Sequence, residues 1–462
     1  MSETTVPIGL FDRAIRRIAT VWRDMGSGVT DADQGFAAQM QACLSARGGE
    51  ASARNRAAKL AETYRTLDEA GRTRFLRTVA EFDSDPEAVD IAYDALRAAG
   101  DPAERATATM KLRRALEAPR VRLLTQFTTI PDGMKFLVDL RATLLTRVKG
   151  DPTLTALESD LCTLLANWFD VGFLELRRID WMSPALLLER LVGYEAVHEI
   201  RSWSDLKNRL DSDRRCYALF HPRMPNEPLI FVEVALVKGL AGSVQRLLDK
   251  KAPLLDPKDA DTAIFYSISN CQRGLAGISF GNYLIKRVVE VLGREYGTLK
   301  QFATLSPIPG FRRWLDAALK ASDGDLLSSD EAAALAKAIP GEAGGNQALA
   351  AILAKRGWFR DPALQKAVEP ILVRLAARYL LVEGSKGRAL DPVAHFHLSN
   401  GARLERILMG ADTSEKGIKE SATLMVNYLY DPAKTEEYHE DYAQDGKRNA
   451  PTAIRKMSKG WA

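Results

Sequence analysis

The 462-residue sequence contains few of the residues that bind metals or form disulfides, with only four cysteines and five histidines. The cysteines lie far apart, and no two of them have the CxxC spacing that structural zinc sites use. This distribution argues against a disulfide framework and against a zinc site, and it fits a reducing compartment. The cysteines are Cys43, Cys162, Cys216 and Cys271.

The sequence also has little charge excess, because 64 basic residues stand against 60 acidic ones for a net charge of +4. This value argues neither for nor against an anionic ligand, since a local basic patch is enough to bind a phosphate-bearing substrate. The basic segment from Lys447 to Lys459 has few aromatic residues and is typical of a solvated end. We therefore do not expect nucleic acid as a partner.

Long apolar runs are absent, and none approaches the roughly 20 residues that a membrane span needs. Near the start, arginines at 13, 16, 17 and 23 predict an amphipathic helix that Asp12 and Asp24 interrupt, which disfavours a transit peptide. We therefore expect a cytoplasmic protein that does not bind a membrane.

The first part of the chain, residues 1–190, is expected to form a helical domain. Turn signals at 84–86, 100–102 and 150–152 each place an aspartate at a helix cap and a proline in the first turn. This part has no recognisable catalytic cluster, so we interpret it as a scaffold or an oligomerisation surface. A homo-oligomer is expected on this basis.

The remaining residues, 191–462, are expected to form a mixed-sheet domain with a helical insertion at about 315–385, which gives an α+β fold class. A helix predicted over 282–292 lies between two predicted strands, and this order favours a parallel strand pair with a crossover helix. Short apolar runs predict strands over 216–220, 229–237, 262–269, 302–305, 393–398 and 424–430.

A glycine-rich turn precedes the predicted helix, with glycines at 274, 277 and 281. These glycines would let a ligand approach the backbone, and the helix N-terminus would direct N–H groups and positive dipole at an anion. The spacing is neither that of a dinucleotide fingerprint nor that of a P-loop, so a nicotinamide cofactor is a poor fit. A tight structural turn explains the glycines equally well.

Ser306 follows the predicted strand 302–305, at the sheet edge where ligands collect in open α/β sheets. Pro307 restricts Ser306 to extended conformations and stiffens the loop that carries its hydroxyl. The local sequence alone also fits an ordinary serine at the start of a turn.

Two of the five histidines, His395 and His397, fall in the segment 391–402. On the strand predicted there, they would share one face. No third metal ligand joins them at a familiar spacing, so we expect no metal, and an acid–base or hydrogen-bonding role near neutral pH is the alternative to a structural one.

Taken together, five segments resemble the malonyl-CoA decarboxylase family, and LSPIPGF and FHLSNGA are the most specific motifs in them. The resemblance implies a catalytic domain similar to GNAT acetyltransferases, joined to a helical N-terminal domain. It also implies decarboxylation of malonyl-CoA to acetyl-CoA and CO2 through a thioester enolate, without a metal or an organic cofactor. The segments are 220–236, 262–292, 302–315, 391–407 and 424–431.

By motif, the family's catalytic serine and histidine correspond to Ser306 and His397. The glycine-rich turn departs from the GNAT pattern Gln/Arg-x-x-Gly-x-Gly/Ala, because Ser279 and Ala276 occupy two of its positions. We therefore expect a grip on the CoA pyrophosphate that is dominated by the backbone. The candidates for CoA binding are Gly277, Ile278, Ser279, Phe280, Gly281, Asn282, Lys286 and Arg287, and the supporting candidates near the site are His395, Asn400 and Tyr428.

Two other functions are compatible with the same residues. A GNAT-like acyltransferase would pass an acyl group to an amine, and formation of acetyl-CoA without any acceptor would argue against it. A non-catalytic acyl-CoA sensor would bind malonyl-CoA tightly and leave it intact.

Overall fold

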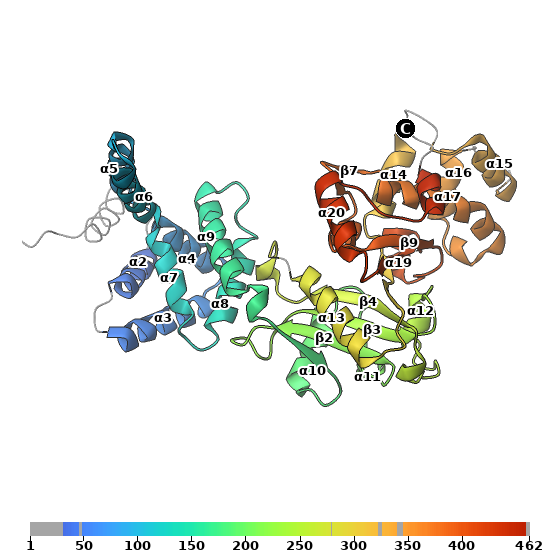
Figure 1. Ribbon diagram of the computed structural model, residues 1–462, viewed down its shortest axis with the longest axis horizontal. Helices are drawn as coiled ribbons and strands as arrows, with labels where there is room; N and C mark the ends of the chain where they lie inside the picture. Colours follow the sequence, from blue (N-terminus) through green and yellow to red (C-terminus); the bar gives the residue numbers. More distant parts are fainter. Residues whose placement is uncertain (1–30, 46–48, 279, 322–325, 340–344, 459–462) are drawn as a thin grey trace, which may run out of the picture. The chain divides into compact units, whose positions relative to one another are not determined.

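The computed structural model describes residues 31–45, 49–278, 280–321, 326–339 and 345–458 (Figure 1). The amphipathic helix predicted from the N-terminal arginines, and Ser279, lie outside these ranges. The chain divides into two compact units, which we call the helical unit and the sheet unit. The helical unit comprises residues 1–174, 221–225 and 272–279, and the sheet unit comprises residues 175–220, 226–271 and 280–462.

The helical unit begins its helices where the sequence predicts. Asp85, Asp101 and Asp151 each accept hydrogen bonds from backbone N–H groups of the following helix, which has a proline in its first turn. The helices are α2 (Asp31–Leu44), α3 (Gly49–Thr66), α4 (Glu69–Glu81), α5 (Pro86–Ala98), α6 (Pro102–Leu116), α7 (Pro119–Phe127), α8 (Gly133–Leu144) and α9 (Pro152–Trp168), with short 3-10 turns η1 (Val171–Phe173) and η3 (Arg273–Leu275).

The sheet unit is built on an eight-stranded sheet of order β1-β2-β3-β4-β5-β10-β6, in which β9 pairs with β10 from the other side. Among the described strands, only β4 and β5 pair in parallel, and helix α13 (Gly281–Glu295) connects them as predicted. The strands are β1 (Glu175–Ile179), β2 (Arg214–Phe220), β3 (Pro228–Val237), β4 (Thr262–Asn270), β5 (Gln301–Thr304), β6 (Ser306–Pro307), β9 (Arg403–Leu408) and β10 (Met425–Tyr430). A separate hairpin pairs β7 (Gly384–Ser385) with β8 (Arg388–Ala389).

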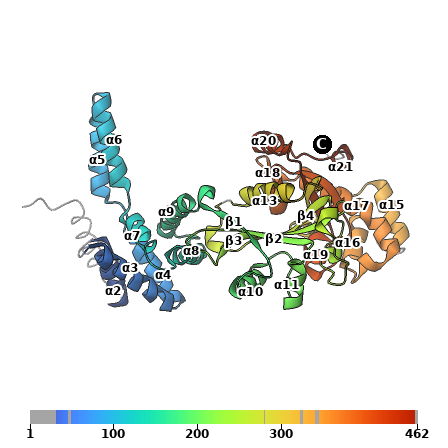
Figure 2. The same ribbon diagram turned by 60° about the horizontal axis from the view of Figure 1, so that its bottom comes forward.

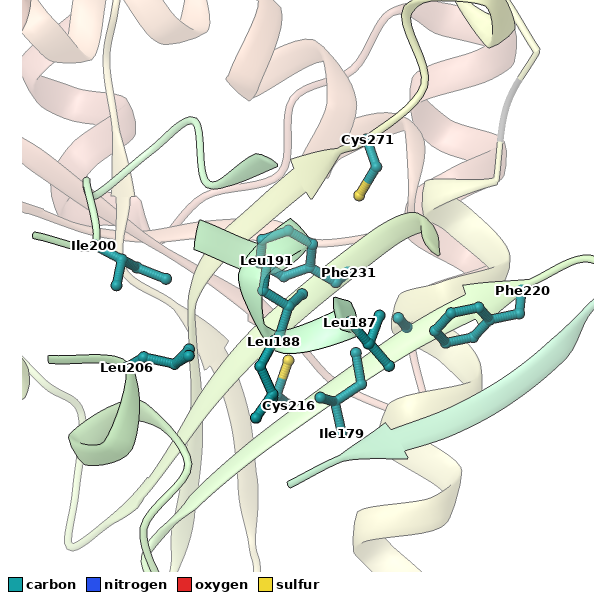
Figure 3. Close-up of a cluster of buried hydrophobic side chains, with 11 residues drawn as sticks. Ile179, Leu187, Leu188, Leu191, Ile200, Leu206, Cys216, Phe220, Phe231 and Cys271 are labelled. Atoms are coloured by element: carbon teal, nitrogen blue, oxygen red, sulfur yellow. The ribbon is translucent and has the colours of Figure 1, made fainter. Parts of the chain in front are cut away.

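The two faces of the sheet follow the alternation of the strands. On β2, Cys216, Ala218 and Phe220 belong to a buried cluster with leucines of α10 (Ala185–Tyr194) and α11 (Trp203–Arg209), as Figure 3 shows. Tyr217 points to the opposite side, where its hydroxyl lies 3.4 Å from Glu295 at the end of α13. Helices therefore cover both faces of this part of the sheet.

Further helices follow β6, and the predicted helical insertion is present (Figure 2, orange). The insertion contains α14 (Phe311–Lys320), α15 (Ser329–Ala338), α16 (Asn346–Ala354), η4 (Trp358–Arg360) and α17 (Pro362–Leu381). Ser328 and Glu331 form a capping box at the start of α15. The remaining elements are α12 (Val244–Leu247), η2 (Pro257–Asp259), α18 (Pro392–Ser399), α19 (Glu415–Ser421), α20 (Thr435–Asp445) and α21 (Thr452–Ser458).

The predicted α+β class is confirmed, but the strand predicted over 393–398 is wrong. These residues lie in helix α18, because Asp391 caps the first turn through the N–H groups of Val393 and Ala394, and Pro392 occupies that turn. The apolar run alone did not distinguish a short strand from a short helix.

Besides the two-residue strands β6, β7 and β8, two longer strands escaped prediction, and these carry charged side chains. β1 has the sequence ELRRI and β9 has the sequence RLERIL, and neither contains a continuous apolar run. β1 forms one edge of the sheet, where half-buried and exposed arginines are compatible with strand structure. It begins at Glu175, ahead of the domain boundary that the sequence placed at about residue 190.

In the part of the chain that the structure describes, no helix combines the length and apolar character that crossing a membrane requires.

Candidate active site

Ser306 lies where the chain leaves the parallel pair of strands. Its strand, β6, pairs with β10 so that Ser306 stands opposite Val426. The N–H of Ile308 donates a hydrogen bond to the Ser421 hydroxyl, which fixes the following turn. Ser306 is buried, and its hydroxyl therefore faces the interior of the sheet unit.

His397 approaches Ser306 from helix α18 and is 2% exposed. Its Nε2 lies 3.0 Å from the Ser306 hydroxyl oxygen, and its Nδ1 lies 2.8 Å from the Tyr430 hydroxyl oxygen. The Ser306 hydroxyl donates to the Thr304 hydroxyl at 2.9 Å. The structure thus brings together the two residues that the sequence singled out, 91 positions apart, and adds a partner on each side.

These four side chains form one continuous chain of hydrogen bonds. Because Ser306 donates to Thr304, its oxygen is free to accept the Nε2–H of His397, and Nδ1 then accepts the hydroxyl proton of Tyr430. Burial lowers the pKa of His397 to about 3, so the imidazole is neutral at neutral pH. Such a chain can exchange protons by switching hydrogen-bond direction without creating a buried charge.

Tyr428 and Tyr430 hold the imidazole from two directions. The Tyr428 ring stacks on the His397 ring with centroids 4.6 Å apart and planes inclined by 26°. The backbone N–H of Tyr428 also donates to the Thr304 hydroxyl at 3.1 Å. Burial raises the pKa of both tyrosines, so both hydroxyls keep their protons. The orientation of His397 is therefore determined by strand β10.

Asn400 is buried beside Tyr430, at the C-terminal end of the helix that carries His397. Its side-chain nitrogen has no hydrogen-bond partner among the described residues. A substrate oxygen is one group that could satisfy this donor.

Asp391 connects the two segments that carry Ser306 and His397. Its side chain is fully buried; Oδ1 accepts two N–H groups of α18 at 3.0 Å, and Oδ2 accepts the N–H of Gly310 at 3.3 Å. Gly310 closes the SPIPG turn, and an added Cβ there would lie 2.1 Å from the Tyr379 hydroxyl oxygen. Asp391 therefore fixes the turn after Ser306 relative to the start of the His397 helix.

Thr304, Tyr430 and Asp391 were not among the residues singled out from the sequence. Thr304 precedes the candidate Ser306 by two positions, and Tyr430 follows the candidate Tyr428 by two positions. Residues two apart in a strand lie on the same face, so this spacing could have indicated both. Asp391 carries the Asp-Pro signature of a helix start, which the strand interpretation concealed.

A cavity of about 320 Å³ opens beside Ser306 and His397. Its walls come from residues 265–268 of β4, from Pro307, and from Val393 and Phe396 of α18. Most of this lining is apolar, while the two candidate catalytic groups supply polar atoms. The cavity is suited to an acyl group whose reacting atoms meet Ser306 and His397.

The start of helix α13 contacts α18 directly. Gly281 is its first residue, and a Cβ added there would lie 2.2 Å from Cε2 of Phe396. The N-cap residue, Phe280, makes no side-chain cap hydrogen bond, and the first N–H groups of an α-helix have no intrahelical partner. The glycine is thus required for packing, and the N-terminus of α13 keeps the features of an anion site.

The other residues predicted to bind CoA are distributed differently. Gly277 (φ +83°) and Ile278 belong to the helical unit, while the residues from Phe280 onward belong to the sheet unit. Lys286 forms an ion pair of 2.6 Å with Glu436, and Arg287 forms one of 2.7 Å with Glu290. The Asn282 side-chain oxygen is buried without a partner among the described residues.

His395 does not share a face with His397, because residues two apart in a helix point in nearly opposite directions. Its Nδ1 lies 2.8 Å from the Tyr442 hydroxyl oxygen, which also accepts the N–H of Ala389. It faces a second, polar cavity of about 590 Å³, which Arg388 also lines. The prediction of a common face is wrong, since it assumed a strand.

Within the described ranges, no group of three or more histidine, cysteine, aspartate or glutamate side chains is arranged to hold a metal ion.

Comparison with known proteins places these features in a family. The model of the malonyl-CoA decarboxylase C-terminal domain matches residues 172–461, and that of the N-terminal domain matches residues 82–169. The mitochondrial malonyl-CoA decarboxylases of Anser anser anser and Mus musculus are 40% and 39% identical over 325 and 332 residues. These matches span 68% and 69% of this chain, and 64% and 67% of the curated relatives.

Solved structures agree with this assignment. The malonyl-CoA decarboxylase of Rhodopseudomonas palustris is 42% identical with a TM-score of 0.82, and that of Agrobacterium vitis is 40% identical with a TM-score of 0.83. Each match covers 92% of this chain and 99% of the solved chain. A buried serine–histidine pair beside an acyl-sized cavity in an α+β unit is compatible with acyl-thioester chemistry. The chain belongs to the malonyl-CoA decarboxylase family.

Proposed function

We propose that this protein decarboxylates malonyl-CoA to acetyl-CoA and CO2, with Ser306 and His397 as its catalytic residues. The observation that carries the proposal is the 3.0 Å contact between these two side chains, inside the cavity and inside the two most specific family motifs. The family supplies the substrate, and the geometry supports the roles of the residues.

The reaction breaks the bond between the α-carbon and the carboxylate, and its electron pair forms a thioester enolate. One proton must then reach the α-carbon, so that malonyl-CoA and a proton give acetyl-CoA and CO2. As charge develops on the thioester oxygen, the Ser306 hydroxyl turns its proton from Thr304 to that oxygen and donates a hydrogen bond to it. His397, neutral and held by Tyr430, orients the carboxylate or relays the proton.

The apolar walls of the cavity favour this reaction. The malonyl carboxylate is a localised charge that loses water on entering, whereas the enolate spreads its charge over several atoms. Phe265, Ile268 and Val393 provide such walls next to the polar pair. Holding the carboxylate out of the enolate plane requires a rigid site, and the stacked Tyr428 ring supports that rigidity.

The N-terminus of α13 is the proposed contact for the CoA pyrophosphate, through the backbone of Phe280, Gly281 and Asn282. Gly277, Ile278, Ser279, Lys286 and Arg287 remain further candidates, and Asn400 and Tyr428 remain supporting ones. His395, the third supporting candidate, lines a different cavity, and we propose a minor role for it. The absence of a cofactor requirement, the cytoplasmic location and the homo-oligomeric state are also parts of this proposal.

The test is incubation of the purified chain with malonyl-CoA alone, with and without a metal chelator, followed by mass spectrometry. We expect stoichiometric acetyl-CoA and CO2 in both cases, and turnover at least about 1,000-fold lower in Ser306→Ala. Acyl transfer that depends on an added amine would instead identify an acyltransferase. Tight binding of intact malonyl-CoA without turnover would identify a sensor, and either result would overturn the proposal.

A further inference from the structure

The helical unit contains a cavity of about 530 Å³, formed by α3, α4, α8 and the turn η3. All of its lining residues belong to the helical unit, including Arg273 of the returning segment 272–279. The roles proposed above for the sheet unit do not use this cavity. We call it the helical-unit cavity.

The lining of the helical-unit cavity is strongly basic. Five cationic side chains line it: Arg65, Arg72, Lys135, Arg147 and Arg273. Only two acidic side chains, Glu69 and Asp139, accompany them. A concave surface with such an excess concentrates positive potential, and this is the electrostatic signature of an anion site.

The two acidic side chains neutralise the positive charge of the cavity only weakly, because they are more exposed to solvent than their cationic partners. Arg147 is 15% exposed while its partner Glu69 is 78% exposed. Lys135 is 24% exposed while its partner Asp139 is 58% exposed. Glu69 is also shared with Arg72, at 3.7 Å. An ion pair with one partner exposed to water is a weak interaction, so these cations keep much of their positive electrostatic potential.

Arg65 and Arg273 have no acidic partner among the residues that the structure describes. The Arg65 guanidinium lies over the ring of Phe136, 5.6 Å from its centroid. Phe136 and Tyr64, in an edge-on pair with centroids 5.6 Å apart, form an aromatic part of the wall. The Tyr64 hydroxyl is buried near Thr143 and has no hydrogen-bond partner among the described residues.

The backbone that carries Arg273 is held firmly within the helical unit. Arg141 donates from Nη1 to the carbonyl oxygens of Gly274 at 2.7 Å and Ala276 at 2.8 Å. Gly274 packs so closely on α8 that an added Cβ would lie 1.8 Å from the carbonyl oxygen of Val138. Arg141 is itself held by Glu158 at 2.6 Å. Arg273 is therefore presented to the cavity from a fixed turn.

We propose that the helical-unit cavity binds the phosphate groups of a nucleotide. Guanidinium groups suit phosphate because they offer several donors in one plane, and an aromatic wall suits a base. The volume is in the range of sites for such ligands. The nucleotide is either the phosphorylated adenosine end of a CoA thioester, in which case the inference rests on the proposed function, or a free nucleotide.

The experiment is isothermal titration of the full-length protein with adenosine 3′,5′-bisphosphate and, separately, with ATP. We expect one of the probes to bind one site per chain, and the double variant Arg65→Glu/Arg273→Glu to bind it at least about tenfold more weakly, since charge-assisted contacts to phosphate are lost. The matched control is Arg105→Glu/Arg113→Glu, which makes the same charge change at exposed positions of α6. The control should bind within about twofold of the wild type.

A kinetic comparison distinguishes the two sources of the nucleotide. If the ligand is the CoA end, the bisphosphate competes with malonyl-CoA, and the double variant raises KM for malonyl-CoA but not for malonyl-pantetheine. If it is a free nucleotide, ATP binds and the KM for malonyl-CoA is unchanged in the variant. The proposal is overturned if neither probe binds up to about 5 mM, or if the double variant binds like the wild type. Binding needs no turnover, so a chain that binds but leaves malonyl-CoA intact would refute only the proposed activity.

Discussion

His395 and His397 lie on opposite sides of helix α18 and have different surroundings. His397 is 2% exposed and contacts Ser306, Tyr430 and the ring of Tyr428. His395 is half-buried, contacts Tyr442 and borders an open polar cavity. Each Nδ1 meets a tyrosine hydroxyl at 2.8 Å, so the tyrosine contact alone does not distinguish them.

The difference lies in what surrounds the second ring nitrogen. Nε2 of His397 reaches a serine hydroxyl inside an apolar cavity, whereas the cavity beside His395 is lined by cationic and polar groups such as Arg388. Burial lowers the pKa of both imidazoles, but only His397 reaches about 3. We therefore propose that catalysis takes place on the side of α18 that carries His397, which we call its inner side. The side that carries His395 is its outer side, and matched substitutions on the two sides test the proposal.

The largest expected effect comes from replacing the two histidines separately by glutamine. His397→Gln should lower kcat by about 1,000-fold or more, because it removes the group that orients or protonates the substrate. His395→Gln should change kcat by less than about threefold, since the His395 side chain contacts Tyr442, whereas Ser306 and Tyr430 contact His397. Steady-state kinetics with malonyl-CoA measures both.

Binding of a non-reactive CoA thioester should be within about threefold of wild type in both histidine variants, which would show that each is folded. Equal losses of kcat in the two variants would abolish the distinction between the two sides of α18. Wild-type turnover in His397→Gln would remove His397 from the mechanism.

The next largest effect is expected at Asp391, which we interpret as a positioning residue. Asp391→Ala loses both the helix cap and the contact with Gly310, and should lower kcat about 100-fold. Asp391→Asn can keep the cap while losing the Gly310 contact, and should lower kcat about tenfold. KM should change little, since neither variant alters the proposed CoA contacts.

A matched control for Asp391 exists on another helix of the same unit. Asp361 caps α17 through the N–H groups of Ala363 and Leu364, also before a proline. Asp361→Ala should cost about 1 kcal/mol of stability and leave kcat unchanged. If Asp361→Ala lowered kcat as much as Asp391→Ala, the loss would reflect general destabilisation and not positioning.

Much of the sheet unit could be predicted because its strands are continuous apolar runs with proline or glycine at their ends. β3, for example, lies within one residue of its prediction. The α18 segment failed because eight residues are too few for hydrophobic periodicity to separate a helix from a strand, while its Asp-Pro cap was the decisive signal. β1 and β9 were missed because a strand with one face in solvent can carry charged residues, and these two strands therefore lack a continuous apolar run.

The candidate site was predictable only in part. Ser306 and His397 came from motifs, and their contact depends on long-range packing of α18 against β6 and β10, which local sequence does not encode. Tyr430 and Thr304 act through hydrogen bonds that appear only once these segments meet. The roles of all these residues stay predictions until the variants are measured.

A smaller effect is expected from the two tyrosines that contact the histidines. Tyr430→Phe removes the hydroxyl that contacts Nδ1 of His397 and should lower kcat about tenfold. The imidazole still stacks on Tyr428 but loses the hydrogen bond that determines which of its nitrogens carries the proton. Tyr442→Phe makes the same change at His395 and should alter kcat by less than about twofold. Equal effects of the two substitutions on kcat would contradict the comparison.

The smallest expected effect is in the pH dependence of activity. Because burial holds the pKa of His397 near 3, the imidazole stays neutral from pH 8 to pH 5.5, and kcat/KM should vary by less than about twofold in that range. Stability should behave differently. The unfolded chain takes up a proton at this histidine near its ordinary pKa of about 6.5 and the folded chain does not, so His397 favours unfolding progressively as pH falls below that value. Thermal unfolding at each pH should therefore show a smaller acid-dependent decline in His397→Gln than in the wild type, while His395→Gln should show a smaller difference. A drop of kcat/KM centred near pH 6.5 that disappears in His395→Gln would instead place the functional titration on the outer side of α18.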